Sequence, residues 1–184
     1  MSYQNFDDFV ASEANHVPLT PLSFLPRTAL MYPDRRAIVY GDRSYTWQSF
    51  FHRCQRLASA LNGAGVSKGD TVAVLAANTP EMIEAHFGVP MSGAVLNTIN
   101  TRLDDETIAY ILEHGEAKVF IVDYELEPQA KDSLNILKDN DLLVIDILDY
   151  QNFIKEILKT FIEHFFSKLK QFFLFFPAPR KQVS

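Results

Sequence analysis

The residues best suited to phosphate chemistry lie in one loop, which reads Gly63-Ala64-Gly65-Val66-Ser67-Lys68-Gly69. Closely spaced glycines let backbone N–H groups approach a phosphate, and a lysine adds positive charge. A phosphate-binding loop follows a strand and opens a helix, whereas this loop follows a helical pattern and precedes a strand pattern. We therefore interpret residues 63–69 as a connection between two elements.

Candidates for a nucleophile or a metal ligand are isolated from one another. Cys54 falls on the apolar face of a predicted helix, which favours core packing over a reactive thiol. His86 and His114 each lie on a predicted helix without another histidine or cysteine at metal-ligand spacing, so metal ligation is not favoured. His16 precedes the first predicted element, and we expect it to be solvated.

Acidic residues offer two further candidates. The run Asp104-Asp105-Glu106 could attract a cation, but carboxylates in the first turn of a helix are also favoured by the helix dipole. Asp123 follows a buried strand, at the end where open α/β sheets bind ligands, and is the best single functional candidate by position. A structural role is favoured for both. The residues alone define no catalytic, cofactor-binding or metal site.

Strand and helix patterns alternate along the chain, and these elements must position the candidates. The strand patterns are short and nearly unbroken apolar runs, as in strands buried on both faces of a parallel sheet. The predicted helices are 20–31, 47–61, 79–91, 104–113 and 125–138, and the predicted strands are 37–40, 43–45, 71–76, 94–96, 119–122 and 142–145. The expected fold class is α/β, a mostly parallel sheet with helices on both faces.

The predicted core consists of strand residues covered by helix residues. We expect the strand positions to be buried and central, and the helix positions to pack on them. The strand positions are Val72, Val74, Leu96, Val119 and Ile121, and the helix positions are Phe50, Leu57 and Ile83.

Composition bounds the class of protein. The chain has 184 residues, of which 47% are hydrophobic and 22% charged, as in one ordinary globular unit. A net charge of −6 argues against nucleic-acid binding, because phosphates are neutralised by clustered lysine and arginine. A single cysteine excludes an internal disulfide. The N-terminus lacks a basic and then apolar leader, and Gln182-Val183-Ser184 is not a peroxisomal signal, so a cytoplasmic location is expected.

The last 36 residues differ in composition from the rest, and the predicted boundary divides the chain into 1–148 and 149–184. No glycine follows Gly115, and eight of the fifteen phenylalanines lie beyond residue 150. Residues 150–184 carry six basic and two acidic side chains, so their net charge is +4 and that of the remaining chain is −10. Large apolar residues there fall on one helical face, which predicts an amphipathic helix.

Three interpretations of this tail stay open at this stage. A broken reading frame or altered splicing would explain the abrupt change in composition. The helix could instead pack on the domain that precedes it. Residues 150–176 could also mediate self-association or contact a membrane surface or another partner, although lysine, glutamate and histidine recur along them and exclude a membrane span.

Three long phrases of the sequence read PLTPLSFLPRTALMYPDRRAIVYGDRSYTW, GVSKGDTVAVLAANTPEMIEAHFGVPMSGAVLNTINTRL and IAYILEHGEAKVFIVD. In this order they resemble the opening of an acyl-CoA synthetase of the AMP-binding, adenylate-forming superfamily. The similarity is to fatty acyl-CoA ligases of the medium-chain and plant acyl-activating type. It is strong from about Val17 to Asp123 and is lost after Glu156, which makes the tail unrelated to the family.

The resemblance implies the first part of an enzyme that uses ATP, Mg and CoA to activate a fatty or other carboxylic acid. Such a ligase forms an acyl-adenylate and then transfers the acyl group to CoA. In the family, the ATP machinery lies later, in a glycine-rich loop ending in Pro-Lys-Gly, a Thr-Glu segment, a ribose-binding aspartate and a catalytic lysine. None of these motifs occurs here. The resemblance therefore implies an inactive fragment that binds no cofactor alone, one half of a split ligase, or a non-enzymatic interaction module.

Overall fold

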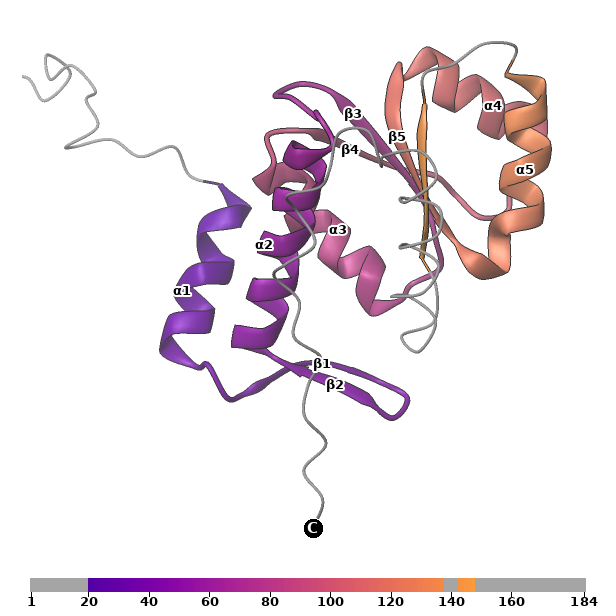
Figure 1. The fold of residues 1–184 in the computed structure, drawn as a ribbon. Coiled ribbons are helices and arrows are strands. Elements are labelled where there is room, and N and C mark those ends of the chain that lie inside the picture. Colours follow the sequence, from indigo (N-terminus) through magenta and orange to yellow (C-terminus); the bar gives the residue numbers. More distant parts are fainter. Residues whose placement is uncertain (1–19, 138–141, 148–184) are drawn as a thin grey trace, which may run out of the picture.

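The structure is a computed structural model that describes residues 20–137 and 142–147. Its centre is a four-stranded parallel sheet with the strand order β4-β3-β5-β6 (Figure 1). The strands are β3 (Thr71–Leu75), β4 (Val95–Thr98), β5 (Ala117–Asp123) and β6 (Leu143–Ile147). Every neighbouring pair is parallel, so a helix connects each strand to the next one along the chain.

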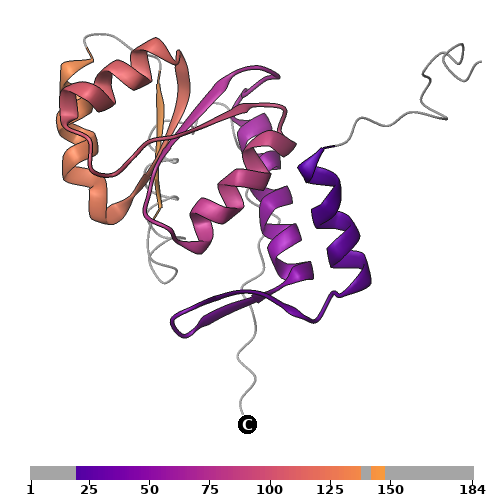
Figure 2. The same ribbon diagram turned by 180° about the vertical axis from the view of Figure 1, so that it is seen from behind.

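Helices cover both faces of the sheet (Figures 1 and 2). One face carries α3 (Pro80–Met91), and the other carries α4 (Asp105–His114) and α5 (Glu127–Ile136). The helix α5 is preceded by the short 3-10 turn η3 (Tyr124–Leu126). On the far side of α3 lies α2 (Trp47–Gly63), and beyond it α1 (Phe24–Met31), preceded by the turn η2 (Pro21–Ser23). The expected α/β class is confirmed.

An antiparallel hairpin forms a separate two-stranded sheet beside the N-terminal helices. It consists of β1 (Arg36–Tyr40) and β2 (Arg43–Thr46), joined by a turn at Gly41, whose φ of 59° favours glycine. The hairpin leads directly into α2, because the Thr46 hydroxyl accepts from the Ser49 backbone N–H at 3.2 Å and caps that helix.

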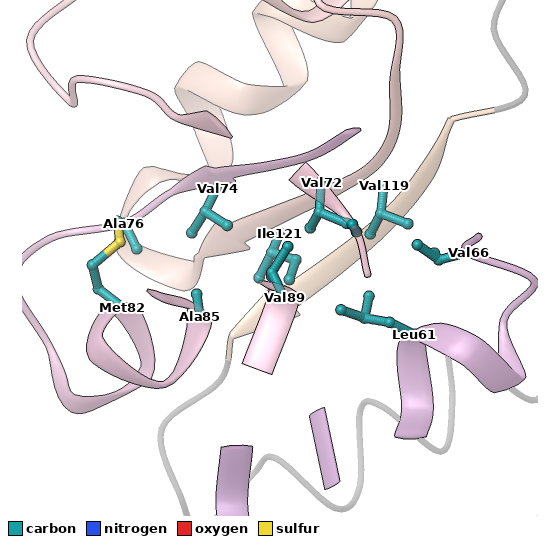
Figure 3. Packing of buried hydrophobic residues seen from close by; sticks show 11 residues of the cluster. Leu61, Val66, Val72, Val74, Ala76, Met82, Ala85, Val89, Val119 and Ile121 are labelled. Atoms are coloured by element: carbon teal, nitrogen blue, oxygen red, sulfur yellow. The ribbon is translucent and has the colours of Figure 1, made fainter. Parts of the chain in front are cut away.

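Alternating strand residues build two apolar clusters, one on each face of the sheet. The α3-side cluster contains Val72 and Val74 of β3, and Figure 3 shows them facing Ala85 and Val89 of α3. The α4-side cluster contains their neighbours Ala73 and Leu75. Both clusters are continued on β5, by Val119 and Ile121 on the α3 side and by Phe120 and Val122 on the α4 side. This alternation is why the strand runs are apolar without interruption.

Most of the predicted core is confirmed. Val72, Val74, Val119 and Ile121 are buried on the two inner strands, whereas Leu96 is partly buried on β4, the outer strand next to β3. Leu57 packs against the α3-side cluster as expected.

Two helix positions were predicted wrongly. Ile83 is 41% exposed, because Met82, Ala85 and Val89 form the inward stripe of α3 and Ile83 is rotated by about 100° from Met82. Phe50 is buried, but its cluster is a third one, with Leu25 and Cys54, near the hairpin instead of the sheet. The helical spacing of apolar residues predicts which face of a helix is buried, but it does not predict which neighbouring element covers that face.

The observed boundaries of the helices and strands lie within a few residues of the predicted boundaries. The predicted helix over 20–31 begins with the turn η2, and the predicted strand over 142–145 runs to Ile147. The predicted boundary at residue 149 and the predicted tail helix lie outside the described residues. Within the described ranges, no helix combines the length and the apolar character needed to cross a membrane.

Candidate functional site

Ligands of open α/β sheets bind at the carboxyl ends of the strands, and Asp123 lies at that end of β5. Its carboxylate accepts from the Glu125 backbone N–H at 3.3 Å and caps η3. The structure thus places Asp123 where the sequence predicted it and gives it the structural role of a cap.

The turn from β3 into α3 lies at the same edge of the sheet. Thr79 occupies the N-cap position of α3, yet its side chain makes no capping bond there. Its hydroxyl oxygen is buried and has no hydrogen-bond partner among the described residues. The turn, Ala76-Ala77-Asn78-Thr79, contains no glycine, so it lacks the residues that let backbone amides wrap around a phosphate. This turn therefore lacks the features of a phosphate-binding loop.

The loop over 63–69 lies at the opposite edge, because it enters the amino end of β3. The Lys118 ammonium of β5 donates to the Gly65 carbonyl at 2.9 Å and to the Asp70 carboxylate at 2.7 Å. The Ser67 backbone N–H donates to the same carboxylate at 2.7 Å. These bonds, led by that from Lys118, hold the pKa of Asp70 below its usual value. The loop is a connection, as predicted, and the bonds from Lys118 hold it to β5.

Cys54 and the histidines have structural surroundings. Cys54 is fully buried, and burial raises the pKa of its thiol to about 12. The Nδ1 atom of His86 lies 2.8 Å from the Met82 carbonyl oxygen one turn earlier on α3. The ring of His114 stacks on that of Tyr110, with 5.3 Å between centroids. His16 lies outside the described residues.

The acidic run at the start of α4 is a helix start. The Asp104 carboxylate accepts from the Thr107 backbone N–H at 2.8 Å, which lowers the pKa of Asp104. Asp105 and Glu106 lie in the first turn, where the helix dipole favours negative charge. Across residues 20–137 and 142–147, no three histidine, cysteine, aspartate or glutamate side chains are grouped to hold a metal ion.

Sequence reasoning missed a charged network between α2, α3 and the hairpin. The Arg43 guanidinium of β2 donates to Glu81 at 2.8 Å, and the Arg53 guanidinium of α2 donates to both carboxylate oxygens of Glu84, one of them at 3.1 Å. Arg53 also lies over the Tyr45 ring, 5.0 Å from its centroid. The sequence did carry one indication of this network. Glu84 is a charged residue that lies between Met82 and Ala85, two α3 residues that face the sheet.

Burial and pairing oppose each other in this network. Glu84 is only 7% exposed, and burial raises the pKa of its carboxyl although Arg53 acts in the other direction. Burial also disfavours the charged form of Arg53, but the hydrogen bond and charge of Glu84 outweigh it, so the pKa of Arg53 is raised. The network joins three elements and contains no nucleophile. It is a structural device that fixes the hairpin and α2 to α3.

The fold therefore defines a parallel α/β layer whose polar side chains mostly cap, connect and pair elements. The sequence model of the family described as AMP-binding enzyme matches residues 25–170. The chain belongs to the AMP-binding enzyme family.

Two relatives of this chain are named as CoA ligases. The chain is 48% identical over 137 residues to a peroxisomal trans-cinnamate:CoA ligase of Petunia hybrida, a match that covers 74% of this chain and 24% of the relative. It is 50% identical over 131 residues to a peroxisomal butyrate–CoA ligase of Arabidopsis thaliana, which covers 71% of this chain and 23% of the relative. The chain thus spans about a quarter of the length of these relatives.

A solved structure has the same fold. O-succinylbenzoate coenzyme A synthetase from Bacillus subtilis, in complex with ATP and magnesium ion, is 28% identical with a TM-score of 0.58. The superposition covers 67% of this chain and 32% of that chain. The fold is that of the N-terminal domain of adenylate-forming enzymes. The family match reaches residue 170, while the boundary predicted at residue 149 stays a prediction.

Proposed function

We propose that this chain is the N-terminal portion of an AMP-forming acyl-CoA ligase and supplies scaffold for its adenylate-forming domain. The observation that carries the proposal is the identity of 48–50% to two CoA ligases over about three quarters of the chain. The ligase reaction proceeds in two steps. A carboxylate attacks the α-phosphate of ATP and releases pyrophosphate, and the CoA thiol then attacks the acyl-adenylate and releases AMP.

The acid that is activated is proposed to be a small aliphatic or aromatic carboxylic acid. The relatives act by name on cinnamate and butyrate, and this supports a class that includes short fatty acids. The described residues contribute apolar clusters and capped helices to such an enzyme. The ATP-binding motifs of the family are not among them, and these are the groups that would stabilise charge on the α-phosphate.

Isotope exchange between pyrophosphate and ATP tests the proposal. The chain alone, given butyrate or cinnamate, should show only background exchange. Co-expression with the remainder of the Arabidopsis ligase, lacking the segment that matches this chain, should restore exchange above that of the remainder alone. An Ile121→Asp variant, which places a charge in the α3-side cluster, is the control that should not restore it.

Both possible failures are informative. Acid-dependent exchange by the chain alone would show that it carries catalytic groups of its own. Failure of complementation by a folded chain would contradict the role as the N-terminal portion of a ligase, and would favour an interaction module.

A further inference from the structure

Exposed apolar side chains are concentrated near the N-terminal helices. Among residues 20–137 and 142–147, eleven large apolar or aromatic side chains are exposed, and six of them lie between residues 24 and 40. Three of the six are consecutive at the end of α1, where Leu30 is 81%, Met31 62% and Tyr32 50% exposed. Single exposed apolar residues are ordinary, whereas a contiguous group of them marks an interaction surface.

Two exposed arginines follow this group in the turn between α1 and β1. Residues 30–36, here named the α1–β1 corner, read LMYPDRR. Arg35 and Arg36 are both exposed, and the Arg35 guanidinium lies over the Tyr32 ring, 5.4 Å from its centroid. The corner therefore presents aliphatic, aromatic and cationic groups side by side.

Backbone hydrogen bonds fix the corner to the start of α2. The Trp47 N–H donates to the Arg35 carbonyl at 2.9 Å, and the Gln48 N–H donates to the Pro33 carbonyl at 3.2 Å. Within the corner, the Arg35 N–H donates to the Tyr32 carbonyl at 3.2 Å. These bonds hold the apolar side chains of the corner outward, at one end of the molecule beside the hairpin (Figures 1 and 2).

Charge is divided unevenly between this end of the molecule and the other. Residues 20–63 contain six arginines, no lysine and two acidic residues, so their net charge is +4. The other described residues, 64–137 and 142–147, contain four basic and thirteen acidic residues, a net charge of −9. The ion pairs of the hairpin and α2 with α3 neutralise two charges on each side, which leaves +2 and −7. An anionic surface therefore attracts the end with the corner and repels the opposite end.

We propose that the α1–β1 corner docks on an anionic phospholipid surface, with Leu30 and Met31 inserted among the headgroups and Arg35 and Arg36 at the phosphates. Apolar side chains bordered by basic groups bind such an interface through buried apolar area and through attraction to anionic lipid. The ring of Tyr32 has the amphipathic character that suits the level of the headgroups. This inference goes beyond the proposed ligase function and does not depend on it, because no ATP chemistry is involved.

A second copy of the chain and a nucleic acid fit the corner less well. A two-fold contact of the corner with itself would place arginines against arginines. A contact with the acidic end of another copy would not be self-complementary, so it would not close into a dimer. Nucleic-acid binding depends on neutralised phosphates, and the exposed side chains of Leu30 and Met31 contribute nothing to that.

Co-sedimentation of the full chain with vesicles tests the proposal. Vesicles of phosphatidylcholine with phosphatidylglycerol should bind the chain, and vesicles of phosphatidylcholine alone should bind it much less. Trp47 is the only tryptophan of the chain and is bonded to the corner, so quenching of its fluorescence by brominated lipid reports the approach of the corner. Residues 150–176 contain no tryptophan, so a contact made by that segment would not itself produce the quenching.

Two double variants remove the two kinds of group separately. Leu30→Gln with Met31→Gln removes the apolar groups and should weaken binding to the mixed vesicles by about tenfold or more. Arg35→Gln with Arg36→Gln should weaken it by about 25-fold, since each basic group near an anionic surface contributes about fivefold. All four positions are exposed, so circular dichroism should show an unchanged fold in both variants.

Matched controls change the same kinds of residue in the acidic part of the chain. Ile136→Gln on α5 replaces an exposed isoleucine, and Arg102→Gln replaces an exposed arginine. Both controls should bind the mixed vesicles as the unchanged chain does.

Four outcomes would overturn the proposal. They are no binding to the mixed vesicles, equal binding to both kinds of vesicle, a bound chain in which Trp47 is not quenched, and undiminished binding by both double variants. A dimeric mass without vesicles that Leu30→Gln with Met31→Gln abolishes would replace the proposal with a contact between two copies. Isotope exchange tests the ligase proposal without lipid, so the two proposals can fail separately.

Discussion

Arg53 of α2 and Glu84 of α3 form a two-bond ion pair across the interface of the two helices, with Glu84 almost fully buried. A charged pair inside an apolar interface holds its partners in one geometry, because displacing either helix leaves a charge without a counterpart. Glu81 and Arg43 extend this pair to the hairpin. The orientation of the N-terminal elements therefore depends on the network.

Breaking the pair should destabilise the fold by more than an exposed pair would. Glu84→Ala leaves the partly buried Arg53 without its partner, and we expect a loss of about 3 kcal/mol in urea unfolding. Glu127→Ala removes the exposed pair with Lys131 and should cost less than about 1 kcal/mol. The double variant Arg53→Met with Glu84→Leu should lose less than the sum of the losses caused by Arg53→Met alone and Glu84→Leu alone. Additive losses would show that the two side chains are not coupled.

Two isoleucines provide a matched test of the sheet core. Ile121→Ala removes buried side-chain volume from the α3-side cluster and should lower the free energy of unfolding by about 2–5 kcal/mol. Ile83→Ala changes an exposed position on α3 and should lie within about 0.5 kcal/mol of the unchanged chain. Equal melting temperatures for the two variants would contradict the assigned orientation of α3.

Gly88 of α3 should not tolerate a methyl group. A Cβ at this position would lie 2.8 Å from Leu57 Cδ2, 2.9 Å from Leu57 Cβ and 3.0 Å from the Cys54 carbonyl oxygen. Alanine usually stabilises a helix relative to glycine, but here we expect Gly88→Ala to cost about 1–3 kcal/mol through overpacking of α2 and α3. A gain in melting temperature would show that the helices can separate without loss.

The bond between Lys118 and Asp70 should make stability depend on pH in acid. The pKa of Asp70 is lower in the folded chain, so the unfolded chain binds more protons as the carboxylate titrates. The contribution is present above the unfolded value of about 3.9 and is lost as pH falls through the lower folded value. Urea unfolding should be measured from about pH 6 to about pH 2, which spans this titration. The free energy of unfolding should fall less with decreasing pH in Lys118→Met than in the unchanged chain. An identical decline would show that Lys118 does not set this pKa.

Local patterns in the sequence predicted the sheet and its helices, because the inner strands β3 and β5 are buried on both faces and the helices α2 and α4 have clear N-caps. Thr46 and Asp104 were recognisable as caps, and both make the expected hydrogen bonds. An N-cap depends on residues only a few positions apart along the chain, so it can be predicted from the sequence alone.

Pairing between distant elements could not be predicted in the same way. The partner of Glu84 lies on α2 and that of Glu81 on β2, and no local pattern connects them. Phe50 shows the same limit, since its apolar character gave no indication that Leu25 would cover it. For the candidate site, the position of Asp123 followed from the order of strands and helices, but its role as a cap depends on the turn that follows it.

The strand order has a consequence for folding during synthesis. β3 lies between β4 and β5, so one edge of it can pair as soon as Val95–Thr98 has left the ribosome. Its other edge stays open until Ala117–Asp123 is made, since β5 is the strand that pairs there. In that interval Val72 and Val74 belong to a strand with free N–H and C=O groups, which is the kind of edge that recruits other chains. A nascent chain arrested before residue 117 should consequently be the form most prone to aggregate, and chaperone binding should be concentrated in that interval.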